Sequence, residues 1–343
     1  MAFRTRLPLV ALLAVAAIPA PRTSACAQSL DLTINHTGLS IGDSRFVRGV
    51  RLNFRDRNLE LVEGINITIW TPYEGARGVV KGLAIGLPVT GARRIEGGGV
   101  GVFGVGAEQD FTGIGIGGFG VGAGRDLTGI MIGGFGVGGG GNVTGLTIGG
   151  FGAGSGGNVK GITIGGFGAG AGGDVTGLQI GGFGVGSGGR VKGITIGGFG
   201  AGAGGDIQGL TIGGFGAGAG GDITGITIAG FGAGSGGTLR GYALAAFGVG
   251  APRIRGIVMA SAAGGQDVEG LIIAPVYFKI ERNGRVKGIT ASAFNHIKGE
   301  QFGLSIGLLN YAWEVHGWQI GVLNYAGNNR PGLRLLPLFN REW

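Results

Sequence analysis

The stretch VKGITIGGFGAGAGGD occupies residues 159–174 and recurs without a change at residues 191–206. It belongs to a block of eight consecutive sixteen-residue units that begins at Phe111 and ends at Thr238. Each unit starts with an apolar residue, a polar residue and a glycine, and each contains the phrase GFG. Self-similarity at a fixed short period is typical of repeat architectures, in which a unit is stable only when it is stacked on its neighbours.

Looser copies of the same phrase flank the block of eight units. Residues 28–110 contain irregular units such as VEGINITIW at 62–70, and residues 239–343 contain degenerate units such as VEGLII at 268–273. We expect these two segments to cap the open edges of the repeat block, because unpaired strand edges promote aggregation.

The pattern within one unit predicts strands that bend at glycine. In residues 143–158, Leu146, Thr147 and Ile148 alternate apolar and polar with the period of a strand, and Phe151 and Ala153 continue the alternation in the opposite phase. Gly149 and Gly150 lie at this phase break, which indicates a bend or bulge there. A second phase break lies at Gly145, between Val143 and Leu146. We therefore expect the valine, leucine or isoleucine, and phenylalanine positions inside, with glycine at the corners.

Two all-β architectures satisfy this pattern. In a β-solenoid each unit is one coil and identical residues stack, so that the eight units form a rod of about 38 Å at about 4.8 Å per coil. In the alternative, an antiparallel outer-membrane β-barrel, each unit is one strand and a tight turn. The near-verbatim repetition favours the solenoid, because identical residues do not stack in antiparallel strands.

The first 27 residues predict an export signal. Arg4 and Arg6 precede the apolar residues 7–20, and Ala25, Cys26 and Ala27 are small residues before a cleavage point. The apolar stretch is shorter than the roughly 20 residues that span a bilayer. Cleavage after Ala27 would remove the only cysteine, whereas a lipoprotein would keep Cys26 as its acylated first residue.

Charge is sparse in this chain and mildly basic. Of its 343 residues 87 are glycine and only 13% are charged, with a formal net charge of +8, so a disordered tail or a coiled coil is not indicated. The densest basic cluster predicts one polar face of a strand, formed by Arg45, Arg48, Arg51, Arg55 and Arg57. This face is either solvated or contacts envelope lipid headgroups or polysaccharide. The aromatic interleaving of a nucleic-acid binder is lacking.

A phrase near the C-terminus resembles a known group of proteins. Residues 303–329, GLSIGLLNYAWEVHGWQIGVLNYAGNN, resemble bacterial envelope proteins built from tandem G-Φ-x-I-G-Φ-Φ-N phrases, which are described as surface-repeat proteins. The resemblance implies a bacterial cell-envelope location and no known catalysis. The asparagines of the phrase are Asn295, Asn310, Asn324 and Asn340. They either form a ladder of side-chain amides at a corner of the stack or are exposed turn residues.

Several patterns suggest chemistry without supporting it. GIGGFG at 115–120 matches a dinucleotide-binding fingerprint, but no helix follows it. A column of polar turn residues invites a comparison with calcium-binding solenoids, yet it includes arginine, which favours a turn-forming role: Asp126, Asn142, Asn158, Asp174, Arg190, Asp206, Asp222 and Thr238. Another column is expected on an outer β face, as in ice-binding solenoids, although it is interrupted: Thr147, Thr163, Thr195, Thr211 and Thr227.

Catalytic groups do not cluster in the sequence. His36, His296 and His316 are scattered, and an enzyme would need a pocket in the downstream third, where Trp313, Glu314, His316 and Trp318 are found. We therefore assign no catalytic, cofactor-binding or metal-binding residue. The sequence predicts an exported, non-catalytic protein of the bacterial outer membrane, cell surface or periplasm, with an outer-membrane pore or platform as the alternative. It does not identify a ligand, a partner or an oligomeric state.

Overall fold

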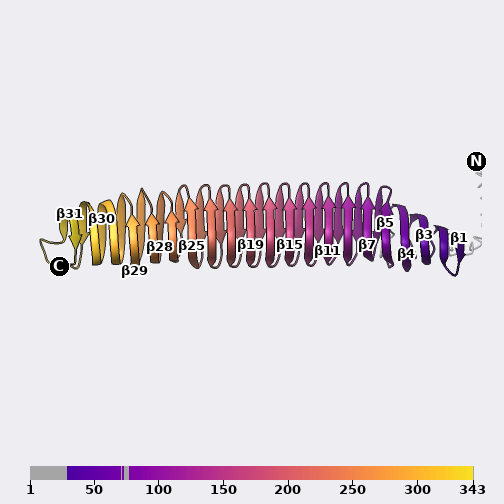
Figure 1. The fold of residues 1–343 in the computed structure, drawn as a ribbon, viewed down its shortest axis with the longest axis horizontal. Helices are drawn as coiled ribbons and strands as arrows, with labels where there is room; N and C mark the ends of the chain where they lie inside the picture. The colour runs from indigo at the N-terminus through magenta and orange to yellow at the C-terminus, as the bar shows by residue number, and fades with distance from the viewer. Residues whose placement is uncertain (1–28, 71, 73–76, 343) are drawn as a thin grey trace, which may run out of the picture.

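The fold is a β-solenoid, as the sixteen-residue period predicts. The computed structural model describes residues 29–70, 72 and 77–342, and this part contains strands and no helix. Figure 1 shows a straight rod in which the coils follow one another along a single axis, from β1 at one end to β31 at the other. The predicted export signal, residues 1–27 with Cys26, lies outside the described residues.

Each central coil contains one long strand, a bend, one short strand and a turn. The long strands are β9 (Phe111–Gly117), β11 (Leu127–Gly133), β13 (Val143–Gly149), β15 (Val159–Gly165), β17 (Val175–Gly181), β19 (Val191–Gly197), β21 (Ile207–Gly213) and β23 (Ile223–Ala229). The short strands are β10 (Gly120–Ala123), β12 (Gly136–Gly139), β14 (Gly152–Ser155), β16 (Gly168–Ala171), β18 (Gly184–Ser187), β20 (Gly200–Ala203), β22 (Gly216–Ala219) and β24 (Gly232–Ser235). The bend at Gly150 and Phe151 confirms the phase break predicted there.

Equivalent strands of successive coils pair in parallel and in register. In β13 and β15, Val143 pairs with Val159 and Thr147 with Thr163, and β14 pairs with β16 in the same way. Identical residues therefore stack, as the solenoid prediction requires. The antiparallel barrel alternative is wrong, because its strands would pair in the opposite direction.

The flanking segments continue the same coil and end in antiparallel strands. The upstream strands are β1 (Ser29–Ile34), β2 (Thr37–Gly42), β3 (Phe46–Arg55), β4 (Leu61–Trp70), β5 (Val79–Gly86), β6 (Val89–Ala92), β7 (Arg94–Gly101) and β8 (Gly104–Ala107). The downstream strands are β25 (Thr238–Ala245), β26 (Gly248–Gly250), β27 (Arg253–Met259), β28 (Ala262–Ile273), β29 (Tyr277–Ala291), β30 (Phe294–Ala326) and β31 (Leu335–Arg341). At the two ends of the rod, β1 pairs antiparallel with β2 and β31 pairs antiparallel with β30.

One glycine in each long strand has a positive φ angle. Gly145 has φ 117° and its successor Gly161 has φ 127°, a region that residues with a Cβ rarely occupy. A Cβ at Gly161 would also overlap the carbonyl oxygen of Gly145 in the preceding coil. The alternation of the strand nevertheless runs through Gly145 unbroken: Val143 and Thr147, four residues apart, point inward, and Leu146 points outward. The second phase break, predicted at Gly145, is therefore wrong.

The interior is narrower than the sequence pattern suggested, and the largest side chains lie outside it. Buried positions of the unit at 143–158 are Val143, Thr147, Ala153 and Ser155. Phe151 is 57% exposed, and the Leu146 and Ile148 positions are only partly buried. The prediction of a core of isoleucine and phenylalanine is therefore wrong. A sixteen-residue coil encloses space for small side chains only, because alanine and serine face the long strand across the core.

The threonine column lies inside the coil and not on an outer face. Thr147 is 1% exposed, and the equivalent threonines of later coils are equally buried. Among the described residues, the hydroxyl groups of Thr163, Thr195, Thr211 and Thr227 have no hydrogen-bond partner. The predicted outer β face of threonine is wrong, and the comparison with ice-binding surfaces loses its basis.

Two glycines of one coil should respond in opposite ways to alanine. Gly177 has φ 130° and a Cβ there would overlap the carbonyl of Gly161, whereas a Cβ at Gly186 would meet no atom within 4 Å. We expect Gly177→Ala to lower the free energy of unfolding by about 1–3 kcal/mol or more. Gly186→Ala should raise it by about 0.4–1 kcal/mol, because alanine restricts the unfolded chain. Urea unfolding followed by circular dichroism would measure both, and equal effects would contradict the assigned backbone.

A second prediction concerns Gln179, which lies in the inward column that also holds Thr147 and Thr163. This side chain is fully buried, and neither of its amide atoms has a hydrogen-bond partner among the described residues. Met131 occupies the same column without a polar group to satisfy. We expect Gln179→Met to raise the free energy of unfolding by about 1–3 kcal/mol.

The matched control for this substitution is Gln208→Met at an exposed position of β21. It should change stability by less than about 0.5 kcal/mol in the same urea titration. A gain at Gln208 and none at Gln179 would show that the column of Gln179 faces solvent.

Candidate binding surface

An apolar strip runs along the outside of the long strands and the adjoining bend. We define it by three outward columns of the eight central units, all of them hydrocarbon side chains. The first column is Ile114, Ile130, Leu146, Ile162, Leu178, Ile194, Leu210 and Ile226. The second is Ile116, Ile132, Ile148, Ile164, Ile180, Ile196, Ile212 and Ile228. The third is Phe119, Phe135, Phe151, Phe167, Phe183, Phe199, Phe215 and Phe231.

The phenylalanines of the apolar strip form a stacked ridge. From Phe119 to Phe247 successive ring centroids are 4.3–5.7 Å apart, and the rings of Phe183 and Phe199 are parallel to within 2°. Phe103 extends the row by an edge-to-face contact with Phe119. Nine spacings of about 4.8 Å make this ridge about 43 Å long. The rings remain about half exposed, so stacking along the rod leaves one side of the ridge uncovered.

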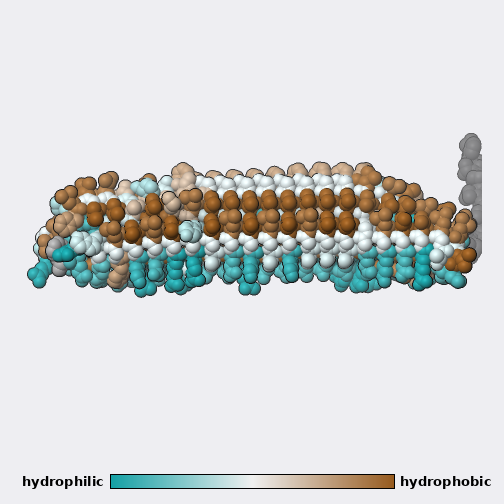
Figure 2. Space-filling view, viewed as in Figure 1, coloured by the Kyte–Doolittle hydropathy of each residue, from teal (hydrophilic) through white to brown (hydrophobic). Residues whose placement is uncertain are grey.

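The apolar strip continues into both flanking segments. Upstream, the first two columns are occupied by Val50 and Leu52 of β3, and downstream by Trp318 and Ile320 of β30. Figure 2 shows the hydrophobic side chains as rows that follow almost the whole rod, with hydrophilic side chains along one edge. Monomeric soluble proteins rarely expose continuous apolar patches above a few hundred Å². A surface of this length therefore marks a contact face.

A basic border flanks the apolar strip on the side of the turns. In each coil it occupies the outward position two residues before the first strip column, and the positive-φ glycine lies between the two. Its cations between β15 and β29 are Lys160, Lys192, Arg240, Arg255 and Lys287. In this span Glu269 is the one acidic residue of the column, so the border carries net positive charge along the strip.

The polar turn column links successive coils by hydrogen bonds. The backbone N–H of Asn158 donates to the side-chain oxygen of Asn142 at 3.0 Å, and the N–H of Asp174 donates to Asn158 at 2.7 Å. Each side chain thus caps the turn of the next coil, which confirms the turn-forming role. Arg190 has no acceptor atom to offer Asp206, and its guanidinium pairs with Asp174 at 3.6 Å.

The asparagine ladder forms, but inside the solenoid. Asn295 donates from Nδ2 to Oδ1 of Asn310 at 2.7 Å, and Asn310 donates to Asn324 at the same distance. All three side chains are buried on the inward positions of the coil, so the reading as exposed turn asparagines is wrong. Asn340 of β31 joins by donating to the backbone oxygen of Asn324 at 3.1 Å.

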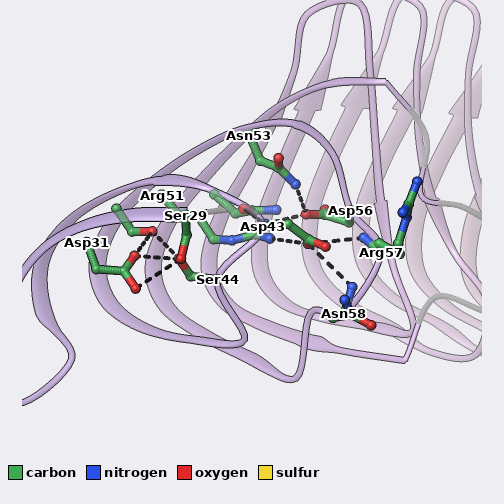
Figure 3. Close-up of polar contacts among 11 residues, drawn as sticks. Ser29, Asp31, Asp43, Ser44, Arg51, Asn53, Asp56, Arg57 and Asn58 are labelled. Atoms are coloured by element: carbon green, nitrogen blue, oxygen red, sulfur yellow. Dashed lines mark hydrogen bonds and ion pairs between the residues drawn. The ribbon is translucent and has the colours of Figure 1, made fainter. Parts of the chain in front are cut away.

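The basic face predicted around β3 does not form. Arg51 occupies the interior column and is fully buried, with Nη2 3.0 Å from Asp43 and Nη1 paired with Asp56. Figure 3 shows this cluster, in which Asn53 also donates to Asp56. Arg45 and Arg48 pair instead with acids of the next coil, Glu60 at 3.8 Å and Glu63 at 2.9 Å.

A second group of polar side chains lies beside this cluster, at the N-terminal end of the rod, and in it Ser40 and Ser44 are buried while Asp31 is exposed. Ser40 donates to the Asp31 carboxylate at 2.7 Å, and hydrogen bonds from Ser44 and Ser40 lower the pKa of Asp31. Alternation assigns Arg48 and Arg51 to opposite faces of β3 but does not say which face is enclosed. The aspartates on either side of Arg51 in the sequence, Asp43 and Asp56, were the signal that could have indicated burial.

The downstream aromatic and titratable residues do not converge on one pocket. Trp313 lines a hollow of about 430 Å³ with Arg282, Asn283, His296, Lys298 and Tyr311. His316 lies elsewhere, stacked on Phe302 and 3.3 Å from Glu342, while Trp318 lies under the Arg341 guanidinium at 5.3 Å. The residues considered for an enzyme pocket are thus divided between different places.

His296 is the best-positioned titratable group in that hollow. Its Nδ1 is 2.9 Å from the Tyr277 hydroxyl, and its ring stacks on Phe294. Burial, together with the charges of Lys298 and Lys279, lowers the pKa of His296.

The described part of the chain contains neither a metal-binding cluster nor a membrane-crossing helix. Within residues 29–70, 72 and 77–342, no three histidine, cysteine or acidic side chains lie close enough together to bind a metal ion. Nor does this part contain a helix that is long and apolar enough to cross a membrane.

Comparison with protein-family models, with curated proteins and with solved structures gives no match. The resemblance to surface-repeat proteins therefore remains a prediction from the asparagine phrase.

Arg190 allows the turn column to be tested. We expect Arg190→Asn to supply the missing acceptor for the Asp206 backbone and to raise the free energy of unfolding by about 0.5–1.5 kcal/mol. Arg190→Ala removes only the exposed pair with Asp174 and should change stability by less than about 1 kcal/mol. Thermal or urea unfolding of both variants gives the comparison, and an unchanged Arg190→Asn protein would mean that the capping bonds contribute nothing.

Proposed function

We propose that this protein is an exported, non-catalytic protein of the bacterial cell envelope, and that its rod has a structural or binding role. The apolar strip is the observation that carries this proposal. Its three columns of hydrocarbon side chains are outward-facing in every central coil, and such a surface is stable in water only when it is covered. An envelope offers extended apolar surfaces for it to contact.

The rod form itself supports a role in binding or support over one in catalysis. Its coils repeat most of their outward residues, so neighbouring coils present similar chemistry. The hollow of about 300 Å³ in the central block lies among turn and border residues such as Asp174, Arg190 and Lys192. Catalysis needs different groups that converge on one reacting atom. In the described residues, His316 lies beside Glu314 and Glu342, whereas His296 lines a separate hollow.

Features of the sequence support the envelope location. The basic start, apolar stretch and small residues of positions 1–27 are typical of an export signal, and the asparagine phrase resembles surface-repeat proteins. The alternative of a pore or platform depended on an antiparallel barrel. Parallel pairing of β13 with β15 removes that structural basis.

Fractionation of a Gram-negative bacterium that expresses the full chain with a C-terminal tag tests this proposal. We expect the protein in the envelope fraction with its N-terminus at Gln28, as read by mass spectrometry. A chain that lacks residues 2–27 is the control and should remain in the cytoplasm. An acylated N-terminus at Cys26 would identify a lipoprotein and would also place the protein in the envelope.

Recovery of the full chain in the cytoplasm, with residues 1–27 retained, would contradict the proposal. Complete release into the culture medium, with no envelope-bound fraction, would contradict the envelope role while leaving export in place.

A further inference from the structure

We propose that the apolar strip binds the surface of a lipid bilayer, with the rod lying flat and the basic border against anionic headgroups. This inference rests on the proposed envelope function and names the contact that the apolar strip makes there. The long axis of the rod would lie in the membrane plane, and the apolar strip would enter the region between headgroups and acyl chains. No part of the chain needs to cross the bilayer in this arrangement.

The chemistry of the apolar strip fits hydrocarbon better than it fits a typical protein interface. Its first two columns contain only leucine and isoleucine in the central units, and its third contains only phenylalanine. The backbone groups beneath are paired with the coils on both sides, as β15 is with β13 and β17. Protein interfaces typically contain about one hydrogen bond per 100–200 Å². The apolar strip offers no side-chain donor or acceptor in the central units, whereas lipid chains require none.

The position of the apolar strip on the rod is that of an interfacial element. Hydrophobic rows and hydrophilic side chains occupy separate lengthwise zones in Figure 2, so the whole rod is amphipathic along its length. Elements with one apolar and one polar face lie in the membrane plane with the apolar face a few ångströms deep. Trp318, at the C-terminal end of the apolar strip, is half exposed beside Arg341, and indole rings favour the headgroup level.

The basic border supplies charge that complements an anionic membrane. Lys160 and Lys192 lie two coils apart on the same outward column, with Thr176 between them. In each coil, the positive-φ glycine separates this column from the first strip column. The long lysine side chains can keep the ammonium group at headgroup level while the apolar strip is buried. The acids Asp174 and Asp206 belong to the turn column, which is farther from the apolar strip along the coil. Each cation near such a surface strengthens adsorption, and salt weakens it.

Flotation with vesicles of phosphatidylcholine alone, and of phosphatidylcholine with phosphatidylglycerol, tests the proposal on the purified mature chain. We expect binding to both compositions and binding several-fold tighter to the anionic vesicles, with the difference lost at high salt. Lys160→Gln with Lys192→Gln should reduce the preference for anionic vesicles and leave binding to neutral vesicles unchanged.

Two uncharged double variants separate the apolar strip from the rest of the rod. Ile164→Gln with Ile180→Gln places amides in the strip, and we expect partitioning into neutral vesicles to fall at least about tenfold. Gly170→Gln with Gly186→Gln adds the same groups to outward positions of the short strands β16 and β18, where there is room for a Cβ. This control should bind within about twofold of the unmodified chain.

Cysteine labelling gives a readout that does not depend on comparing affinities. The mature chain is predicted to contain no thiol, so Ile180→Cys or Gly186→Cys carries a single environment-sensitive dye. We expect a blue shift with vesicles for the dye at residue 180 and none for the dye at residue 186. Circular dichroism of each labelled chain shows that it is folded.

Absence of vesicle binding by the folded chain would overturn the proposal, as would equal binding of the strip and control variants. A second copy of the chain is the main competing occupant. A dimer in light scattering that dissociates in Ile164→Gln with Ile180→Gln, with no vesicle binding, would assign the apolar strip to self-association. The vesicle assay is independent of cell fractionation, so an envelope-located protein that ignores vesicles contradicts this inference alone.

Discussion

The close approach of one glycine to the carbonyl oxygen of the preceding coil is the constraint on which the rest of the structure depends. At Gly161 the backbone adopts a positive φ and lies against Gly145 with no space for a Cβ. The same contact recurs in coil after coil and aligns the parallel strands in a single register. The strand alternates through this contact, so Thr147 points inward and its neighbours Leu146 and Ile148 point outward. Stacking and register thus follow from one backbone conformation, and the narrowness of the coil decides which face is enclosed.

The stacked coils form a rod whose polar columns lie partly inside and whose largest apolar side chains lie outside. The interior accepts polar groups where the stack itself can satisfy them, as when Asn310 both receives and donates an amide hydrogen bond. Where the column holds threonine or Gln179, the chain retains polar atoms without protein partners. Burying such atoms is unfavourable, and parallel pairing along the whole rod compensates for it. The charged cluster of Arg51 closes the same interior column near the N-terminal end.

The outer surface connects this architecture to function. Side chains that the narrow coil cannot enclose become a continuous apolar strip, and in-register stacking aligns its phenylalanines into one ridge. A surface of identical hydrocarbon rows lacks the varied donors and acceptors with which proteins distinguish partners, but it suits an extended, laterally uniform phase. The basic border adds an electrostatic preference without adding shape specificity. These properties make the whole rod, and not a single pocket, the functional unit.

The sequence by itself determined the period, a bend at the glycine pair 149–150, which the structure places at Gly150 and Phe151, and the turn-forming column. It favoured parallel stacking of like residues over an antiparallel barrel. These features depend on local glycine chemistry and on repetition, both of which can be read along the chain. It predicted that the asparagines could form a ladder, but not that Asn295 and Asn310 are buried. Only the tertiary structure decided which side of each strand is inside. Alternation assigns Thr147 and Ile148 to opposite faces but does not say which face is enclosed, because that depends on the volume left between the long and short strands. That volume is small, so threonine and alanine fill it, and isoleucine and phenylalanine form the surface.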